Sequence, residues 1–461
     1  MMKLKILQNI ISFLQVNITN KINTSVSTKI VPWITLERIR IYPPLIPTLM
    51  LTTWIASVLL GPGLTDISGT IIGSDFLAFY TAGNFWLSGT MDCLYDFQAQ
   101  FLFQKSVIEP VESNALYPFI NPPFVAVLFA FFAKFSYLIA LFIWWSWGLL
   151  LLVISIILLK AEFPNFDRYS VPKLFIYCFM FFPTLAWLTY GQNTTHTLLL
   201  YTIIFIMLRR RKDLIAGIAL GLLLYKPQLA ITICLVLLLK WRWRALVGGM
   251  LGSGFWLLVG FASSSSAMQK YIQVAPHLFG LLRSGGNIEF PTWGIHSFFG
   301  FSSLLLDNIW VGGANILAAC LSICCIIFIA LIWFGTEWKV GSRSWDLLMA
   351  ATFGMGLIIS PHLYIYDLML LLLPFAIVWN HHITGKNGRA LDGNFLLFWS
   401  AILYIFCFIG SYISVIQLKA LELLGLSPFA VQLSTLLIFC WCVSVIRDEA
   451  NPNLKNLVEQ L

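Results

Sequence analysis

Apolar stretches long enough to cross a lipid bilayer, about 17–25 residues each, recur along nearly the whole chain. The clear ones are 43–62, 138–159, 172–190, 193–208, 213–225, 227–240, 244–262, 312–334, 345–360, 363–379, 394–414 and 428–446. Segments 118–133 and 296–309 are shorter and are spans, tilted helices or re-entrant pieces. Only 10% of the residues are charged, against about 25% in soluble proteins. The sequence therefore predicts an all-α integral membrane protein with about 11–14 transmembrane helices and no separate soluble domain.

The distribution of charge predicts the topology. Six basic residues precede the first span, where Glu37 is the only acid. The segment that follows, 63–117, carries six acids and a single base, Lys105. Because Lys and Arg mark cytoplasmic loops, the N-terminus is expected inside and 63–117 outside. The net charge of +8 is thus a topology signal, and nucleic acid is not an expected partner.

The expected organisation is a cytoplasmic amphipathic segment over 1–42, a membrane domain over 43–446 and a cytoplasmic tail over 447–461. The domain has two large outer loops, 63–117 and 263–300. From Arg209 onward, successive loops alternate between the cytoplasmic and outer sides. Between 118 and 208 the number of predicted spans does not fit this alternation, so one span there is miscounted or re-entrant. A multi-pass protein of the plasma (inner) membrane, with both termini cytoplasmic, is the prediction.

Asp75 lies where a helix is expected to begin in the first outer loop. Ser74 or Asp75 is a suitable N-cap and Gly89 a suitable stop, and Phe79 and Tyr80 belong to an apolar face at helical spacing. A helix lying flat at the outer interface is predicted, with Asp75 at the end where the dipole favours a carboxylate. Such an acid is a candidate general base. The alternative, favoured by spacing alone, is that it only caps its helix.

Two further polar breaks interrupt apolar runs. Gln192 and Asn193 follow Tyr190 and Gly191, and the alternative to a functional role is a tight turn. Lys226 stands between two apolar runs with no other charge nearby. Its ammonium suits a phosphate oxygen, and the alternative is that the side chain extends to the membrane interface.

A third break follows Pro361. His362 lies at the outer end of the next run, and Asp367 lies five residues into it. Tyr364 is three residues from Asp367 and is expected on the same helix face. A single histidine is more often a packing residue, but a His and an Asp together at a proline break in apolar surroundings indicate function.

The second outer loop carries polar residues with less specific meaning: His277, Arg283, Glu289 and His296. A lid or an acceptor-binding loop is one interpretation, and a solvated loop is the default. Eight of the nine cysteines lie in apolar runs, so neither a disulfide framework nor a cysteine metal site is expected.

Five motifs occur in order: GSDFLAFYTAGNFWLSG, YPFINPPFVAVLFA, YGQN, GLLLYKPQLA and SPHLYIYDLMLLLLP. Together they resemble glycosyltransferase family 87, polyprenyl-phosphate-mannose-dependent mannosyltransferases of the multi-spanning GT-C class. The resemblance covers about 65–380, most of the chain. The family's catalytic aspartate matches Asp75, its KPQ lysine matches Lys226, and its SPH histidine matches His362. The chain departs from the family after PPF, where a common proline is missing.

The resemblance implies a hexosyltransferase that moves mannose from a polyprenyl-phosphate donor to a lipid or glycan acceptor on the extracytoplasmic side. Asp75 would be the base, and Lys226 and His362 would bind the donor phosphate. Contacts to substrate are expected from Tyr80, Gln192, Asn193, Tyr364 and Asp367. One base implies a single inverting displacement, and no metal or cofactor is expected. The alternatives are a transporter or flippase of lipid-linked sugars, or a surface-polysaccharide polymerase or ligase.

Overall fold

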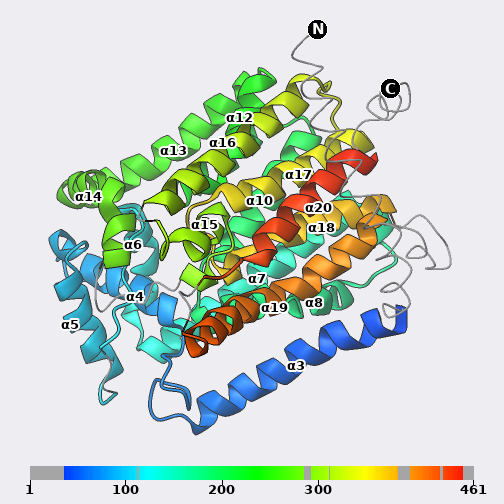
Figure 1. Cartoon of the computed structure of the whole chain (residues 1–461). Helices are drawn as coiled ribbons and strands as arrows, with labels where there is room; N and C mark the ends of the chain where they lie inside the picture. The colour runs from blue at the N-terminus through cyan, green and yellow to red at the C-terminus, as the bar shows by residue number, and fades with distance from the viewer. Residues whose placement is uncertain are drawn as a thin grey trace.

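A computed structural model describes residues 36–111, 114–284, 292–310, 312–382, 395–425 and 429–449. Over these residues the chain is helical and contains no strand, only two isolated bridges (Figure 1). This confirms the predicted all-α class. Most of the predicted amphipathic segment 1–42, and the tail beyond 449, lie outside the described residues. The first helix begins at Leu36, ahead of the predicted start of the membrane domain.

The helices are α3 (Leu36–Leu60), α4 (Ser74–Leu87), α5 (Phe97–Ile108), α6 (Pro123–Phe129), α7 (Tyr137–Glu162), α8 (Val171–Phe179), α9 (Phe182–Tyr190), α10 (Thr194–Arg209), α11 (Asp213–Gly221), α12 (Ile231–Leu239), α13 (Trp243–Ser263), α14 (Ser265–Ser284), α15 (Phe298–Leu306), α16 (Gly313–Phe334), α17 (Arg343–Ile359), α18 (Leu372–His382), α19 (Phe395–Leu423) and α20 (Leu433–Glu449). Short 3₁₀ turns join them, of which η3 (Met91–Cys93), η4 (Phe132–Lys134), η6 (Leu222–Tyr225), η7 (Pro227–Leu229), η8 (Thr292–Gly294) and η9 (Ile365–Leu371) matter below.

Three helices of the described residues, α7, α13 and α16, are long and apolar enough to cross a membrane. Two bent pairs bring the number to five if each is one span: α8 with α9, bent by 75°, and the two halves of α19, bent by 60°. Five shorter apolar helices accompany them. A membrane protein is thus confirmed, while length and composition do not establish the predicted number of 11–14. The reason is that several apolar runs are broken, as at Lys226 and Pro227, where 3₁₀ turns replace a continuous helix.

The run at 118–133 is one of the doubtful segments. Its helix, α6, has only seven residues and begins at Pro123, where proline is tolerated. It packs on α4 so closely that a Cβ at Gly83 would lie 2.4 Å from the carbonyl oxygen of Phe129. α6 is therefore too short to cross a membrane and is grouped with the segment before it. Without a span at 118–133, the predicted spans between 118 and 208 agree with the inside–outside alternation.

Two apolar cores hold these elements. The larger one lies among α10, α12, α17, η9 and α20, with α17 buried along nearly its whole length. The smaller one joins α4, α6 and the start of α7 around Phe76 and Phe129. α4 is buried on most of its surface, so it packs against the protein on more than the one apolar face that its spacing predicts.

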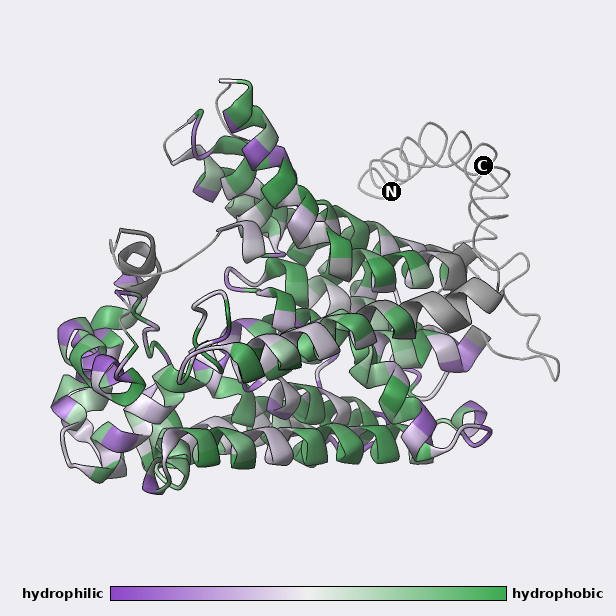
Figure 2. Cartoon of the chain, turned by 90° about the horizontal axis from the view of Figure 1, so that it is seen from below, coloured by the Kyte–Doolittle hydropathy of each residue, from purple (hydrophilic) through white to green (hydrophobic). Residues whose placement is uncertain are grey.

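Charged pairs gather where α7, α10, α17 and α18 end or begin. Arg209 bonds both Glu162, at 2.5 Å, and the fully buried Asp346, at 3.1 Å. His381 Nε2 lies 2.8 Å from the second oxygen of Asp346. Figure 2 shows hydrophobic residues along the helices and hydrophilic ones mostly near their ends. In Figure 1, α4, α5, α6 and α14 lie at one end of the molecule, while α3 begins and α20 ends at the other.

Candidate active site

The start of α4 places Asp75 in the first helical turn. Gly73 takes the N-cap position with φ 69°, and no side chain caps the helix. The expectation that Ser74 or Asp75 caps the helix is therefore wrong, because a left-handed glycine begins it instead. The expected stop is confirmed: the helix ends at Leu87, and Gly89 follows with φ 71°. With no capping bond to make, the Asp75 carboxylate is available to other partners.

A second glycine brings the end of α9 against the start of α4. Gly191 has φ 70°, and a Cβ there would lie 2.7 Å from the Cβ of Phe76. The Gly73 N–H donates to the Thr189 carbonyl at 3.2 Å, which fixes the approach. Only glycine fits position 191, for conformation as well as space. The next residue, Gln192, is thereby directed at Asp75.

Gln192 Nε2 donates to Asp75 Oδ2 at 2.9 Å, and the Tyr366 hydroxyl lies 3.3 Å from the same nitrogen. The Asp75 carboxyl is enclosed by protein yet retains partial access to solvent. Burial raises its pKa to about 6, although bonds from Gln192 and Tyr366 and the charge of Lys226 hold it down. A carboxylate with a pKa near 6 is ionised at neutral pH and suited to take up a proton.

Lys226 also lies near Tyr366. It stands between η6 and η7, and its ammonium is 2.8 Å from Asp367 Oδ1 and 5.9 Å from the centre of the Tyr366 ring. Thr194 Oγ1 donates to the same carboxylate oxygen at 2.9 Å. Lys226 is 8% exposed and Asp367 1%. A buried cation is thus held in place by a buried counter-ion.

His362 and Tyr364 complete the group. Their rings meet edge to face with centroids 4.9 Å apart, and Tyr364 stacks on Tyr366 at 5.7 Å. Burial lowers the pKa of His362 to about 4, Lys226 lowers it further, and Asp367 opposes both. At neutral pH this imidazole is uncharged, so before an anion arrives it acts as a hydrogen-bonding group rather than a second cation.

The sequence profile of glycosyltransferase family 87 matches residues 119–361, just over half of the chain. The chain belongs to glycosyltransferase family 87. No curated protein and no solved structure matches it. The matched region contains Gln192 and Lys226, whereas Asp75 and Asp367 lie outside it and join the site through the contacts above.

The family 87 fold brings together most of the residues predicted from the sequence: Asp75, Gln192, Lys226, His362, Tyr364 and Asp367. Asn193 is buried beside them, and its backbone N–H donates to Gln192 Oε1 at 3.0 Å. It supports Gln192 rather than lining an opening. Tyr80 is not brought to this group, because its hydroxyl donates to the Phe135 carbonyl at 2.9 Å.

Sequence reasoning missed two residues of this group, Tyr366 and Thr194. Tyr366 lies between the two predicted residues Tyr364 and Asp367, but an expected α-helix turned it away from them. The segment is a 3₁₀ helix instead, and Tyr366 lies near Gln192, Asp75 and Lys226. Thr194 follows the YGQN motif directly, which was the available signal.

The second outer loop returns to this group through η8. The expectation of a solvated loop is wrong for His296, which is fully buried with Nδ1 2.6 Å from the Ser434 hydroxyl. Its backbone N–H donates to the Leu363 carbonyl at 2.7 Å, and Ile295 bridges Tyr364. His277 is exposed, whereas the side chain of Arg283, and Glu289, lie outside the described residues.

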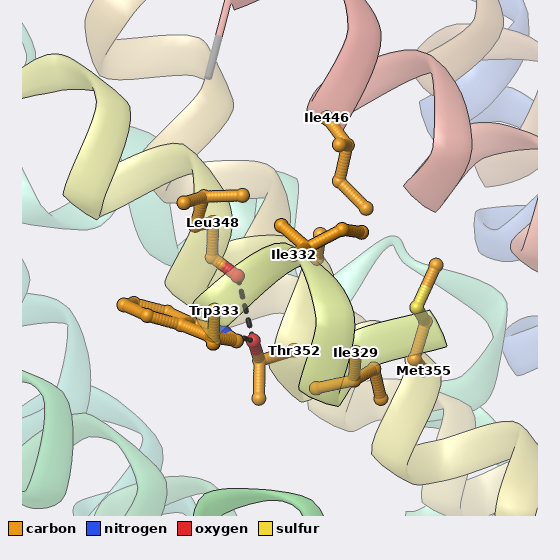
Figure 3. A pocket seen from close by; sticks show the side chains of 8 residues that line it. Ile329, Ile332, Trp333, Leu348, Thr352, Met355 and Ile446 are labelled. Carbon is orange, nitrogen blue, oxygen red and sulfur yellow. Dashed lines mark hydrogen bonds between the residues drawn. The ribbon is translucent and has the colours of Figure 1, made fainter. Parts of the chain in front are cut away.

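Two openings differ sharply in size. A crevice between α16, α17 and α20 holds about 10 Å³, and Trp333 Nε1 already donates to the Thr352 hydroxyl across it at 2.8 Å (Figure 3). It has room for a water at most. The other is a cavity of about 380 Å³ whose lining includes Ser74, Thr189 and Tyr190, which precede Asp75 and Gln192 in the sequence, but not Asp75 or Gln192 themselves. Only this one is large enough for part of a substrate.

Proposed function

We propose that this glycosyltransferase moves a hexose, mannose by family resemblance, from a polyprenyl-phosphate donor to a lipid or glycan acceptor on the outer side of the plasma membrane. One observation supports it above the others. An enclosed carboxyl, Asp75, and a buried lysine, Lys226, lie close to the same tyrosine, Tyr366, and each influences the other electrostatically. A base and a cation arranged in this way suit a displacement at a carbon between an entering hydroxyl and a departing phosphate.

In the proposed reaction the acceptor hydroxyl oxygen attacks the anomeric carbon of the donor. Asp75 takes up the hydroxyl proton as the new carbon–oxygen bond forms. The bond from the anomeric carbon to the phosphate oxygen breaks, and its electron pair leaves on the lipid phosphate. The released phosphate is a stable anion and needs no protonating acid. A single displacement inverts the anomeric configuration.

Lys226 is proposed to meet the charge that develops on the phosphate. Its ammonium has three N–H donors, and one of them donates to Asp367, so the others can donate to an anion. His362 is neutral before the donor binds, and an approaching phosphate would raise its pKa. These two groups supply the electrostatic stabilisation, and a metal is not part of the proposal.

The arrangement of charge supports an extracytoplasmic site. The Arg209, Glu162 and Asp346 cluster joins helix ends that carry predicted cytoplasmic loops, and Asp75 follows the predicted outer end of α3. When α6 is counted in the predicted outer loop, and α8 with α9 as one bent span, successive loops alternate between the two sides of the membrane along the whole chain. Both termini are then cytoplasmic, as the charge pattern predicts.

Purified protein in lipid nanodiscs, supplied with labelled polyprenyl-phosphate-mannose and a mixed membrane-lipid extract as acceptor, tests the proposal. We expect labelled product and released polyprenyl phosphate in equal amounts. In parallel, the protein in liposomes is assayed for movement of the intact donor between leaflets. Movement without cleavage would favour the transporter alternative, and transfer from a lipid-diphosphate donor alone would favour the polymerase or ligase.

A further inference from the structure

The cavity beside Asp75 has a polar end. Its lining includes Asp66, Thr70 and Ser74, and Ser74 directly precedes Asp75. The Asp66 carboxylate accepts from the Ser68 hydroxyl at 2.6 Å and from the Thr70 N–H at 3.0 Å, which fixes the loop wall. Thr189, on the opposite wall, accepts through its carbonyl from Gly73. The hydrogen bond between Gly73 and Thr189, which brings Gln192 to Asp75, therefore also fixes the polar end of the cavity.

The charge of this lining disfavours a phosphate. Among the described residues that line the cavity there is one carboxylate, Asp66, and no lysine or arginine. None of Lys226, His362, Asp75 and Gln192 is part of the lining itself. The cavity reaches the group around Asp75 through Ser74, which directly precedes Asp75, and through Tyr190, whose ring lies 5.6 Å from that of Tyr366. An anionic head would meet an acid here, whereas hydroxyl groups would meet acceptors. Exposed aromatic rings of Tyr190 and Trp293 add faces suited to the C–H surface of a sugar ring.

The other end of the cavity is apolar. Met50 and Leu51 of α3 face Phe182, Leu185 and Ala186 of α9 across it. α3 contacts the rest of the molecule sparsely and exposes much of its surface. The cavity therefore opens between an apolar helix and an apolar wall, a path that suits a hydrocarbon chain and not a free glycan.

We propose that this cavity is the acceptor site and that the acceptor is a lipid with a neutral, polyhydroxylated headgroup. The headgroup hydroxyls lie at the Asp66 end, within reach of Asp75, and the chain passes between α3 and α9. The donor approaches from the side of Lys226. This inference rests on the proposed transferase function, and it names the acceptor class that the function leaves open.

Substitutions that fill the apolar end of the cavity test the acceptor proposal. Met50→Trp and Ala186→Phe add bulk from opposite walls, and Leu331→Trp, on an exposed position of α16, is the matched control. Acceptors are dodecyl mannoside and methyl mannoside, which share a headgroup. Slow hydrolysis of the donor by water reports donor binding without any acceptor.

We expect both filling variants to raise the KM for dodecyl mannoside by at least about tenfold, because lost binding common to ground and transition state appears in KM. Donor hydrolysis and transfer to methyl mannoside should stay at the level of Leu331→Trp. Unchanged KM for dodecyl mannoside would overturn the proposal. Loss of donor hydrolysis in folded filling variants would assign the cavity to the donor and also overturn it.

A labelling experiment separates this inference from the proposed function. Dodecyl mannoside with a diazirine on its chain should label peptides of α3 or α9, and Met50→Trp should abolish that labelling even if no sugar transfer is detected. Labelling of these helices by a diazirine polyprenyl phosphate, and not by the mannoside, would refute the acceptor assignment. Absence of transfer from any polyprenyl-phosphate sugar, with labelling intact, would refute the proposed function alone.

Discussion

Gln192→Leu removes one hydrogen bond to the proposed base and keeps the size of the side chain. The bond from Gln192 Nε2 to Asp75 Oδ2 favours the ionised carboxylate, so its loss must raise the pKa of Asp75. A hydrogen bond to a charged group contributes about 1.5–3 kcal/mol, and the partial solvent access of Asp75 favours the lower end. Since about 1.4 kcal/mol corresponds to one pKa unit, the pKa should rise by about one unit, to about 7.

The rate consequence follows from the sign of this shift. A base acts when deprotonated, so transfer falls as the pH falls through its pKa. In the wild type the decline should be centred near the Asp75 pKa of about 6. In Gln192→Leu it should be centred about one unit higher, which makes transfer about twofold slower at pH 7, about fivefold slower at pH 6 and about ninefold slower at pH 5.

The assay is kcat/KM for sugar transfer from pH 5 to pH 9 in nanodiscs, expressed as variant over wild type so that titration of the donor phosphate cancels. Tyr366→Phe should shift the acid limb the same way by a smaller amount, because its hydroxyl also lowers the Asp75 pKa. Tyr80→Phe is the control without a shift, since its hydroxyl bonds Phe135. An acid limb that stays in place in Gln192→Leu, or moves to lower pH, would refute the assignment of Asp75 as the titrating base.

Three further predictions concern the rest of the site. Lys226→Met should destabilise the protein by about 3–5 kcal/mol, because Asp367 is left as an uncompensated buried charge. The double variant Lys226→Met/Asp367→Leu should recover thermal stability and still transfer no sugar. Recovery of transfer in the double variant would contradict the phosphate-binding role of Lys226. Gly191→Ala should slow transfer at least tenfold, since its Cβ collides with Phe76, whereas Gly254→Ala, with open space around its Cβ, should be neutral in the same assay. Chelation with EDTA should leave transfer within about twofold of the untreated rate, and a loss restored by added Mg²⁺ would show that Lys226 and His362 are not the main electrostatic groups.

Much of this site was predictable because the chain is so apolar. In a background with 10% charged residues, Asp75, Lys226 and Asp367 stand out, and the cost of placing them among apolar helices indicates a purpose. Most helix positions were predictable for the same reason, since the apolar runs coincide with the helices from α7 to α20 except α14, which lies in the segment predicted as the second outer loop.

Local backbone detail was not predictable. Capping propensity favours Ser74 or Asp75, yet a left-handed glycine, Gly73, begins α4, and a Cβ there would lie 2.8 Å from Leu141. Tertiary contact thus overrides propensity. The 3₁₀ helix that turns Tyr366 toward Asp75 is likewise set by packing. Partners far apart in sequence, such as His296 and Ser434, carry no signal of their pairing in a single sequence.

The family 87 match begins at residue 119, so the proposed base lies outside the region that establishes the family. The role proposed for Asp75 rests on its geometry: a bond from Gln192, which belongs to the matched region, and a shared neighbour, Tyr366, with the cation Lys226. The proposed reaction depends on this residue above all others, and it has an isosteric neutral replacement.

Single-turnover transfer by Asp75→Asn is the most direct measurement, with donor binding measured separately by quenching or equilibrium exchange. We predict that the variant binds polyprenyl-phosphate-mannose as tightly as the wild type or more tightly, because an acid is removed near an anion, and transfers sugar about a thousandfold more slowly. Equal rates of transfer in Asp75→Asn and wild type, at equal donor occupancy, would contradict the account.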